Sequence, residues 1–397
     1  MTEWLTREDV DHYLDDRSSK GMTVVQLCLF WGKRTDRPLA FTTNPANAYG
    51  HKAFLEVDGA PDPRQPAIAS GGSAMQPNDF WDHVDYCLQA IRQRGMYAAV
   101  LPFWGRRYLN ASHRDHSEPV FNRRNIEAYG AFLSQRYQSY DNVIWVLGGD
   151  VKATEGGNHV DTYRAFAQAL RAGGSDSKLL TYHPDGSPLV NSSTWFHHDS
   201  WLDFNMIETF SSVDQIAAAI RADRALEPPK PTILAEGDYE GGYDGAVHTD
   251  ALRVRRQAYQ SFFAGAAGFT YGGALDAAGN GPLFGPSNNW KPLLEWKGAE
   301  QMVWLRRFLE TQDWPGWVPS PELIAKGRSE GSREKLAVSS GESILIYFPE
   351  NDACELSLPE VSTAIWFNPA NGRAQHATID MPFQPPTQWE DAVLILK

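Results

Sequence analysis

The stretch Asn142-Val-Ile-Trp-Val-Leu-Gly-Gly-Asp150 is an apolar run that ends in two glycines and a carboxylate. The stretch Pro231-Thr-Ile-Leu-Ala-Glu236 repeats the pattern and ends at Glu236. A buried strand with an acidic residue at its C-terminal end is how a parallel barrel displays catalytic groups. Two such acids that face each other are the minimum equipment for cleaving a glycosidic bond. These stretches therefore predict a fold class and a candidate catalytic pair, Asp150 and Glu236.

Strand-like apolar runs alternate with helical patterns along residues 1–315. Seven runs of strand type lie near residues 25, 100, 146, 180, 206, 234 and 269. This alternation predicts a parallel sheet, and the continuous apolar character predicts that both sheet faces are covered. The predicted fold is α/β, a (β/α)8 TIM barrel. Because such a barrel needs eight strands and the chain opens on a helix, we expect the first strand to be missing, with Asp150 ending strand four and Glu236 strand seven.

Three local expectations accompany this fold. The first helix should begin at Thr6, which is followed by Asp9 in a pattern close to a capping box. Residues 33–76 are rich in proline and glycine and should form one long functional loop. Arg255 and Arg256 should lie on a solvated helix face.

The residue pattern of the sequence changes after residue 315. Helical periodicity stops, and short β-rich runs separated by turn signals take its place at 343–348, 354–358, 362–367, 373–378 and 391–396. Residues 316–397 are therefore expected to form a small C-terminal antiparallel β-sandwich domain. Docking against the barrel is favoured over independent carbohydrate binding.

Composition limits the partners. The 397 residues carry a net charge of −13, which argues against nucleic acid or an anionic membrane because phosphate groups repel such a surface. No run of about 18 apolar residues is present, so no membrane span is expected. The N-terminus does not resemble a signal peptide, which predicts a cytoplasmic protein as written, or a periplasmic or secreted one if an upstream segment is missing. The three cysteines are expected to be small core residues, and the oligomeric state is left open.

Further polar and aromatic residues at predicted strand ends are candidates for holding a sugar. Aromatic rings stack on the apolar faces of sugars, and each of these rings could equally pack at the rim of the barrel. Glu208 could orient the nucleophile or a sugar hydroxyl, and Asp238 and Glu240 could be loop ligands or structural. The candidate substrate-binding set is Trp31, Trp104, His183, Glu208, Tyr239 and Tyr271.

A metal or other cofactor is not predicted. His197 and His198 are adjacent in sequence, and neighbouring histidines usually point apart, which disfavours a shared ion. A metal-dependent barrel hydrolase that uses His183, His197 or His198 remains an alternative. A non-catalytic carbohydrate-binding protein is a second alternative.

Several stretches resemble one known family in order along residues 5 to about 315. They are Asn47-Ala-Tyr-Gly50, Leu101-Pro-Phe-Trp-Gly105, Val143 to Asp150, Trp201-Leu-Asp-Phe-Asn-Met206, Glu236-Gly-Asp-Tyr-Glu-Gly241 and Phe263 to Gly272. They look like the apiosidase-like glycoside hydrolases, glycoside hydrolase family 140 and its relatives. That resemblance implies a (β/α)8 barrel with a C-terminal β domain, and cleavage of an apiose linkage in pectin or of a related furanoside. It also implies that Asp150 is the general acid/base and Glu236 the nucleophile.

The sequence departs from the family pattern at three points. Family members often carry an aromatic-containing segment right after the last strand, where this chain has the small residues Gly273-Ala-Leu-Asp-Ala-Ala-Gly-Asn-Gly281. The family usually opens with a strand and a Gly-Asp-Thr turn, whereas this chain begins after that turn. Ala235 stands where a glycine is expected. The working hypothesis is a retaining glycosidase that acts on a small carbohydrate or glycoside, with its two carboxyl groups about 5–5.5 Å apart, against about 6.5–9.5 Å for an inverting enzyme.

Overall fold

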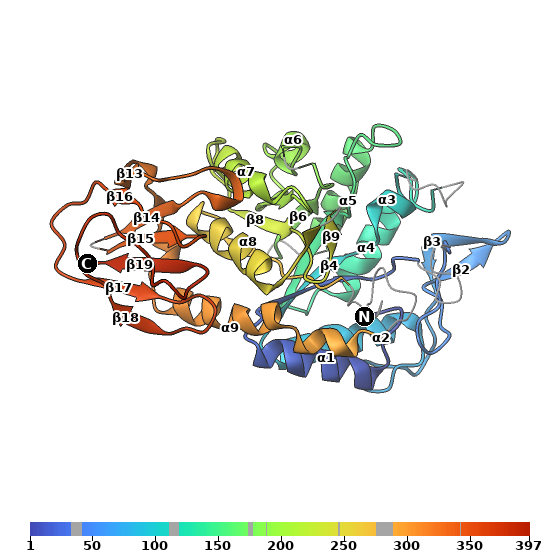
Figure 1. Cartoon of the computed structure of the whole chain (residues 1–397). Helices are drawn as coiled ribbons and strands as arrows, with labels where there is room; N and C mark the ends of the chain where they lie inside the picture. The colour runs from blue at the N-terminus through green and yellow to red at the C-terminus, as the bar shows by residue number, and fades with distance from the viewer. Residues whose placement is uncertain are drawn as a thin grey trace. The chain divides into compact units, whose positions relative to one another are not determined.

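The computed structural model describes residues 1–32, 42–110, 119–173, 178–187, 189–244, 247–274, 289–341 and 343–397 (Figure 1). The chain forms two compact units. Unit 1 contains Met1–Asp185 and Val190–Met206, and unit 2 contains Gly186–Leu189 and Ile207–Lys397. None of the helices among the described residues has the length and apolar character that a membrane crossing requires.

Unit 1 is built on a parallel sheet with the strand order β1-β4-β5-β6. Register pairs Cys28 with Leu101 and Gly148 with His183, so the C-terminal ends of neighbouring strands lie level. The side chains of these strands are mostly buried, as expected for a sheet covered on both faces. The strands are β1 (Val24–Cys28), β4 (Tyr97–Leu101), β5 (Val143–Gly148) and β6 (Leu180–His183).

The helices of unit 1 confirm the predicted alternation. Thr6 caps the first helix through a hydrogen bond from the backbone N–H of Asp9, and Asp79 caps the second through the N–H of Asp82. The helices are α1 (Arg7–Ser19), α2 (Phe80–Gln93), α3 (Gly105–Tyr108), α4 (Ile126–Arg136), α5 (Val160–Ala172) and α6 (Ser193–Phe196). The short α3 and α6 were not predicted.

The prediction of one long loop over residues 33–76 was wrong. Within it the chain forms the antiparallel hairpin β2 (Phe54–Val57) and β3 (Ala60–Pro66). Asp58 and Gly59 form the turn with φ of 52° and 81°, the left-handed backbone that tight hairpin turns require. Residues 33–41 lie outside the described residues.

Unit 2 opens with a second parallel sheet, in the order β11-β8-β7. Its strands are β7 (Asn205–Glu208, which begins in unit 1), β8 (Thr232–Glu236) and β11 (Gly268–Phe269), and a small hairpin pairs β9 (Tyr243–Asp244) with β10 (Val247–His248). Its helices are α7 (Ile216–Arg224), α8 (Ala251–Phe263) and α9 (Lys297–Glu310), with 3-10 turns η1 (Val213–Gln215) and η2 (Lys291–Glu295). All seven predicted strands are therefore confirmed, as one four-stranded and one three-stranded parallel sheet, while the closed TIM barrel stays a prediction.

Beyond α9 the chain forms an antiparallel β domain. Six strands pair in the order β12-β14-β15-β19-β17-β18, and β13 pairs with β16. The strands are β12 (Val318–Pro319), β13 (Ile324–Lys326), β14 (Leu336–Ser340), β15 (Ser343–Phe348), β16 (Glu355–Leu356), β17 (Ala364–Phe367), β18 (Ala374–His376) and β19 (Ala392–Leu396). The 3-10 turns are η3 (Trp314–Gly316), η4 (Pro321–Leu323) and η5 (Gly331–Arg333). The β-rich runs of the sequence are confirmed as strands of this domain.

One expectation about α8 was wrong. Arg255 does not face solvent; its side chain is buried and bonded to Asp391, which directly precedes β19. Helical periodicity could not reveal this contact because the partner lies 136 residues further along the chain. The same contact confirms that the C-terminal β domain docks against the α/β part of the chain.

Candidate active site

Asp150 follows β5 in an unusual backbone conformation. Gly148, Gly149 and Asp150 have φ of 80°, 116° and 48°, all left-handed. A Cβ on Gly148 would lie 2.4 Å from the carbonyl oxygen of His183, and one on Gly149 would lie 3.1 Å from the ring of Trp104. Only glycine fits both positions, which explains the Gly-Gly pair. The left-handed Asp150 costs on the order of 1 kcal/mol, a strain typical of functional sites.

Arg106 on α3 pairs with Asp150. Its Nη1 lies 2.6 Å from Oδ2 of Asp150, and its Nε lies 3.6 Å from a carboxylate oxygen of Glu155. Burial would lower the pKa of Arg106, but the charges of Asp150 and Glu155 raise it. The side chains of Arg106 and Asp150 are 31% and 29% exposed, so solvent reaches the pair. Sequence reasoning missed Arg106, although the Arg106-Arg107 pair, two residues after Trp104, was a usable signal.

The other predicted site residues of unit 1 gather beside Asp150. The rings of Trp31 and Trp104 meet edge to face at 6.1 Å, and those of Trp104 and His183 lie 6.0 Å apart. The buried His183 has its Nδ1 3.4 Å from the backbone nitrogen of Asp150. The guanidinium of Arg107 lies 4.2 Å over the Trp31 ring, a cation–π contact that fixes the ring. This edge of the sheet therefore brings together two tryptophan rings, a buried imidazole and a partly exposed carboxylate.

Glu3 is hydrogen-bonded to the backbone at this edge of the sheet, and no sequence pattern predicted its role. Its Oε1 accepts hydrogen bonds from the backbone N–H groups of Trp31 and Gly32, the latter at 2.9 Å. Burial raises the pKa of Glu3 to about 7, against the opposing effect of these two hydrogen bonds. Glu3 therefore anchors the backbone that carries Trp31.

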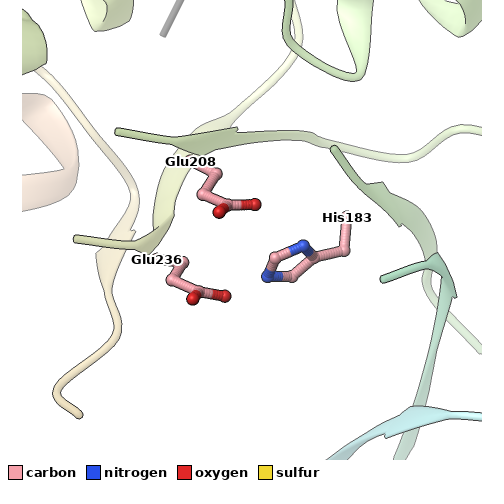
Figure 2. Close-up of side chains that lie close together, drawn as sticks. All are labelled: His183, Glu208 and Glu236. Atoms are coloured by element: carbon pink, nitrogen blue, oxygen red, sulfur yellow. The ribbon is translucent and has the colours of Figure 1, made fainter. Parts of the chain in front are cut away.

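Glu208 and Glu236 form the acidic centre of unit 2. They end the neighbouring strands β7 and β8, and their carboxylates lie side by side (Figure 2). Oxygens of the two carboxylates lie within 4.8 Å of each other. The backbone N–H of Thr209 donates to the carbonyl oxygen of Glu236 at 2.9 Å, which keeps the two strand ends level. Glu208 is only 3% exposed, whereas Glu236 is half-buried.

Tyr239 is placed to orient Glu236. Its hydroxyl donates a hydrogen bond to Oε1 of Glu236, and its ring meets that of Phe210 edge to face at 6.1 Å. A Cβ on Gly272 would lie 2.0 Å from the Tyr239 ring, so the glycine makes room for it. This predicted site residue therefore contacts the candidate nucleophile.

Asp238 and Glu240, the other two acidic residues of this loop, make hydrogen bonds to neighbouring protein groups. Asp238 accepts a hydrogen bond from Nε of Arg253 at 2.8 Å and another from the hydroxyl of Thr249. Glu240 accepts from the hydroxyl of Tyr271 at 2.7 Å and from the backbone N–H of Gly298, in the first turn of α9, at 3.0 Å. Of the two readings left open for Asp238 and Glu240, the structural one fits these contacts.

His197 makes contacts that suit a structural role, and the ring of His198 packs at a steep angle against it. Their rings lie 5.2 Å apart with an interplanar angle of 83°. His197 is buried, and its Nδ1 lies 3.3 Å from the side-chain nitrogen of Asn205.

Comparisons with solved structures show the fold. A glycoside hydrolase superposes with a TM-score of 0.84 at 24% sequence identity, covering 100% of this chain and 90% of that one. A glycoside hydrolase family 5 protein from Bacteroides vulgatus gives the same TM-score and identity over 100% and 86% of the two chains. A family 39 glycoside hydrolase from Bacteroides cellulosilyticus is more distant, with a TM-score of 0.59 at 10% identity over 100% and 80%.

Family models divide the sequence in two. Residues 318–397 match a family named for a collagen-binding domain of a collagenase. A comparison with curated proteins found no match. Residues 1–316 match the family described as apiosidase-like, catalytic domain. Because this second match spans most of the chain, the protein belongs to the apiosidase-like family and is a glycosidase.

Proposed function

We propose that this glycosidase retains anomeric configuration and cleaves a furanoside-type, apiose-like bond in a plant-derived oligosaccharide or glycoside. Glu236 attacks the anomeric carbon while Asp150 protonates the departing oxygen. Asp150 then takes a proton from the water that releases the sugar from Glu236. The observation that carries the proposal is the hydrogen bond from Tyr239 to Glu236, a half-buried carboxylate at a strand end.

The contacts of Glu236 suit a nucleophile. The Tyr239 hydroxyl fixes the plane of its carboxylate, and Glu208 lies beside it on the next strand. A fixed carboxylate reaches the anomeric carbon with little reorganisation. Such preorganisation supplies much of the rate enhancement of enzymes. Glu208 is then available to orient Glu236 or to accept a hydrogen bond from a sugar hydroxyl.

The contacts of Asp150 suit a group that changes protonation during the cycle. The ion pair with Arg106 stabilises the carboxylate that is needed when water attacks. When Asp150 acts as the acid, Glu155 offers the guanidinium a second carboxylate. Trp31 and Trp104 supply apolar faces on which a furanose ring or its leaving group could stack.

Azide rescue of two glycine variants tests both roles. The substrate is an aryl apiofuranoside, with aryl arabinofuranosides for comparison. Glu236→Gly should lose turnover by about 10⁴-fold or more, and azide should restore it with a glycosyl azide of inverted configuration. Asp150→Gly should also be rescued, but with a glycosyl azide of retained configuration. Glu322→Gln, which removes an exposed carboxylate of the β domain, serves as the control.

The anomeric configuration of the product, read by NMR, decides the mechanism. Retained configuration in the first-formed sugar of the unmodified protein supports double displacement, and inverted configuration rejects it. Full activity of Glu236→Gly would remove Glu236 from the mechanism. Cleavage of arabinofuranosides but not of apiofuranosides would be consistent with the mechanism but would reject apiose as the sugar that is recognised.

A further inference from the structure

The helix α8 has two opposite faces with different partners. Arg253 and Gln257 are four residues apart and share one face, while Arg255 lies between them and points to the other side, because each helical residue advances by about 100°. The first face meets the loop that follows Glu236. The second face meets the C-terminal β domain.

On the loop side, α8 holds Asp238, two residues after Glu236. Oε1 of Gln257 accepts the backbone N–H of Asp238 at 2.8 Å, and Nε2 of Gln257 donates to its carbonyl oxygen at 3.2 Å. Nε of Arg253 donates to the carboxylate of the same residue at 2.8 Å. A Cβ on Gly237 would lie 2.3 Å from Gln257, so the loop approaches the helix as closely as glycine permits.

On the opposite side, Arg255 binds Asp391 through a buried fork. Nη2 lies 2.7 Å from Oδ1 of Asp391 and Nε lies 3.0 Å from Oδ2, and each side chain is 1% exposed. Tyr347 donates its hydroxyl to the same carboxylate at 3.0 Å, and Gln301 on α9 accepts from Nη1 of Arg255 at 2.6 Å. A buried, bidentate pair fixes the relative position of its two partners, because two parallel hydrogen bonds allow only one geometry. Losing either partner would leave a buried charge without its counter-charge, which is strongly destabilising.

The sheet of the β domain is covered on both faces where it carries Asp391. Ile346, Phe348 and Leu394 pack into the core of the domain itself. Tyr347 points to the other face, where its ring stacks on Tyr259 of α8 at 5.2 Å. The central strands β15 and β19 therefore present no open face to a ligand, which sets this domain apart from an independent binding module.

We propose that the C-terminal β domain positions the catalytic loop: Asp391 fixes Arg255, and α8 transmits that position through Gln257 to Asp238 and so to Glu236 and Tyr239. Arg255, Gln257 and Asp391 are positioning residues that touch no substrate. The proposal rests on the nucleophile assignment made above. It gives the β domain a role in catalysis itself.

A double-mutant cycle in the full chain tests this. Asp391→Asn cuts the link on the domain side of α8, and Gln257→Met cuts it on the loop side while leaving the domain docked. Each should lower kcat by about 10- to 100-fold, with KM within about twofold, because a small misplacement of a reacting group costs that much. The fold-loss of kcat in the double variant should be much smaller than the product of the two single losses, because both substitutions act through one helix.

A second ion pair between the β domain and the α/β part provides a matched control. Arg221 on α7 binds Glu334 at 3.1 Å, and Glu334 is 8% exposed. Glu334→Gln should lower stability as Asp391→Asn does but leave kcat unchanged when assayed well below the melting temperature. Should Asp391→Asn not fold, Arg255→Lys keeps the charge, loses the fork and takes its place in the cycle.

Two results would overturn the inference: an unchanged kcat in folded Asp391→Asn and Gln257→Met, or multiplicative effects of the two. Its failure is separable from that of the nucleophile assignment, because Glu236→Gly then remains inactive. Full activity of Glu236→Gly would instead reject the assignment itself, whatever the cycle gives.

Discussion

At the scale of single residues, Gly272 decides where the Tyr239 ring can lie. An added Cβ would lie 2.0 Å and 2.2 Å from two ring carbons of Tyr239. We expect Gly272→Ala to push the ring away, break its hydrogen bond to Glu236 and lower kcat about tenfold or more. Gly273→Ala is the matched control, since its Cβ would meet Trp296 at an ordinary 3.4 Å. Equal kcat values for the two alanine variants would contradict the role given to Tyr239.

Sequence could predict residues whose role follows from their own strand, and not those whose role depends on a distant partner. The positions of Asp150 and Glu236 at strand ends follow from an apolar run and the residue after it. Glu3 gains its role from the backbone of Trp31, 28 residues away, and Arg255 from Asp391, 136 residues away. Neither pairing leaves a trace in local periodicity, so Arg255 was wrongly expected in solvent.

At the scale of elements, the start of α8 depends on its cap. The side chain of Asp250 accepts the backbone N–H of Arg253 at 2.8 Å. Asp250→Ala should lower the free energy of unfolding by about 1 kcal/mol, measured by urea denaturation, because a helix N–H loses its acceptor. Asp250→Asn keeps an acceptor and should cost little. A large loss in the asparagine variant would show that charge, rather than capping, holds this helix end.

The elements themselves were predictable to the extent that their patterns are apolar. All seven parallel strands were found because each lies in a nearly continuous, mostly apolar run, although β11 itself is only partly buried. The β2–β3 hairpin was missed because Ala60-Pro-Asp-Pro-Arg-Gln-Pro66 contains three prolines and reads as a loop. Its Asp58-Gly59 turn was a usable signal. Strand pairing inside such a segment depends on its partner β2 and not on its own composition.

At the scale of the whole molecule, the free energy of unfolding should depend on pH through Glu3. Its folded pKa of about 7 lies above the ordinary 4.5, so between these values the folded chain holds a proton that the unfolded chain releases. Stability therefore falls as pH rises through this window, by about 3 kcal/mol in total from this one group.

Glu3→Gln removes that dependence, because an amide stays neutral and its oxygen can still accept the N–H groups of Trp31 and Gly32. Relative to the unmodified protein, the variant should gain about 2.5 kcal/mol between pH 5 and pH 8, measured by urea denaturation at each pH. Glu8→Gln, which removes an exposed carboxylate of α1, should show no such gain. A gain that is the same at pH 5 and pH 8 would mean that Glu3 is ionised in the folded protein throughout, and that the anchor of Trp31 is a buried anion.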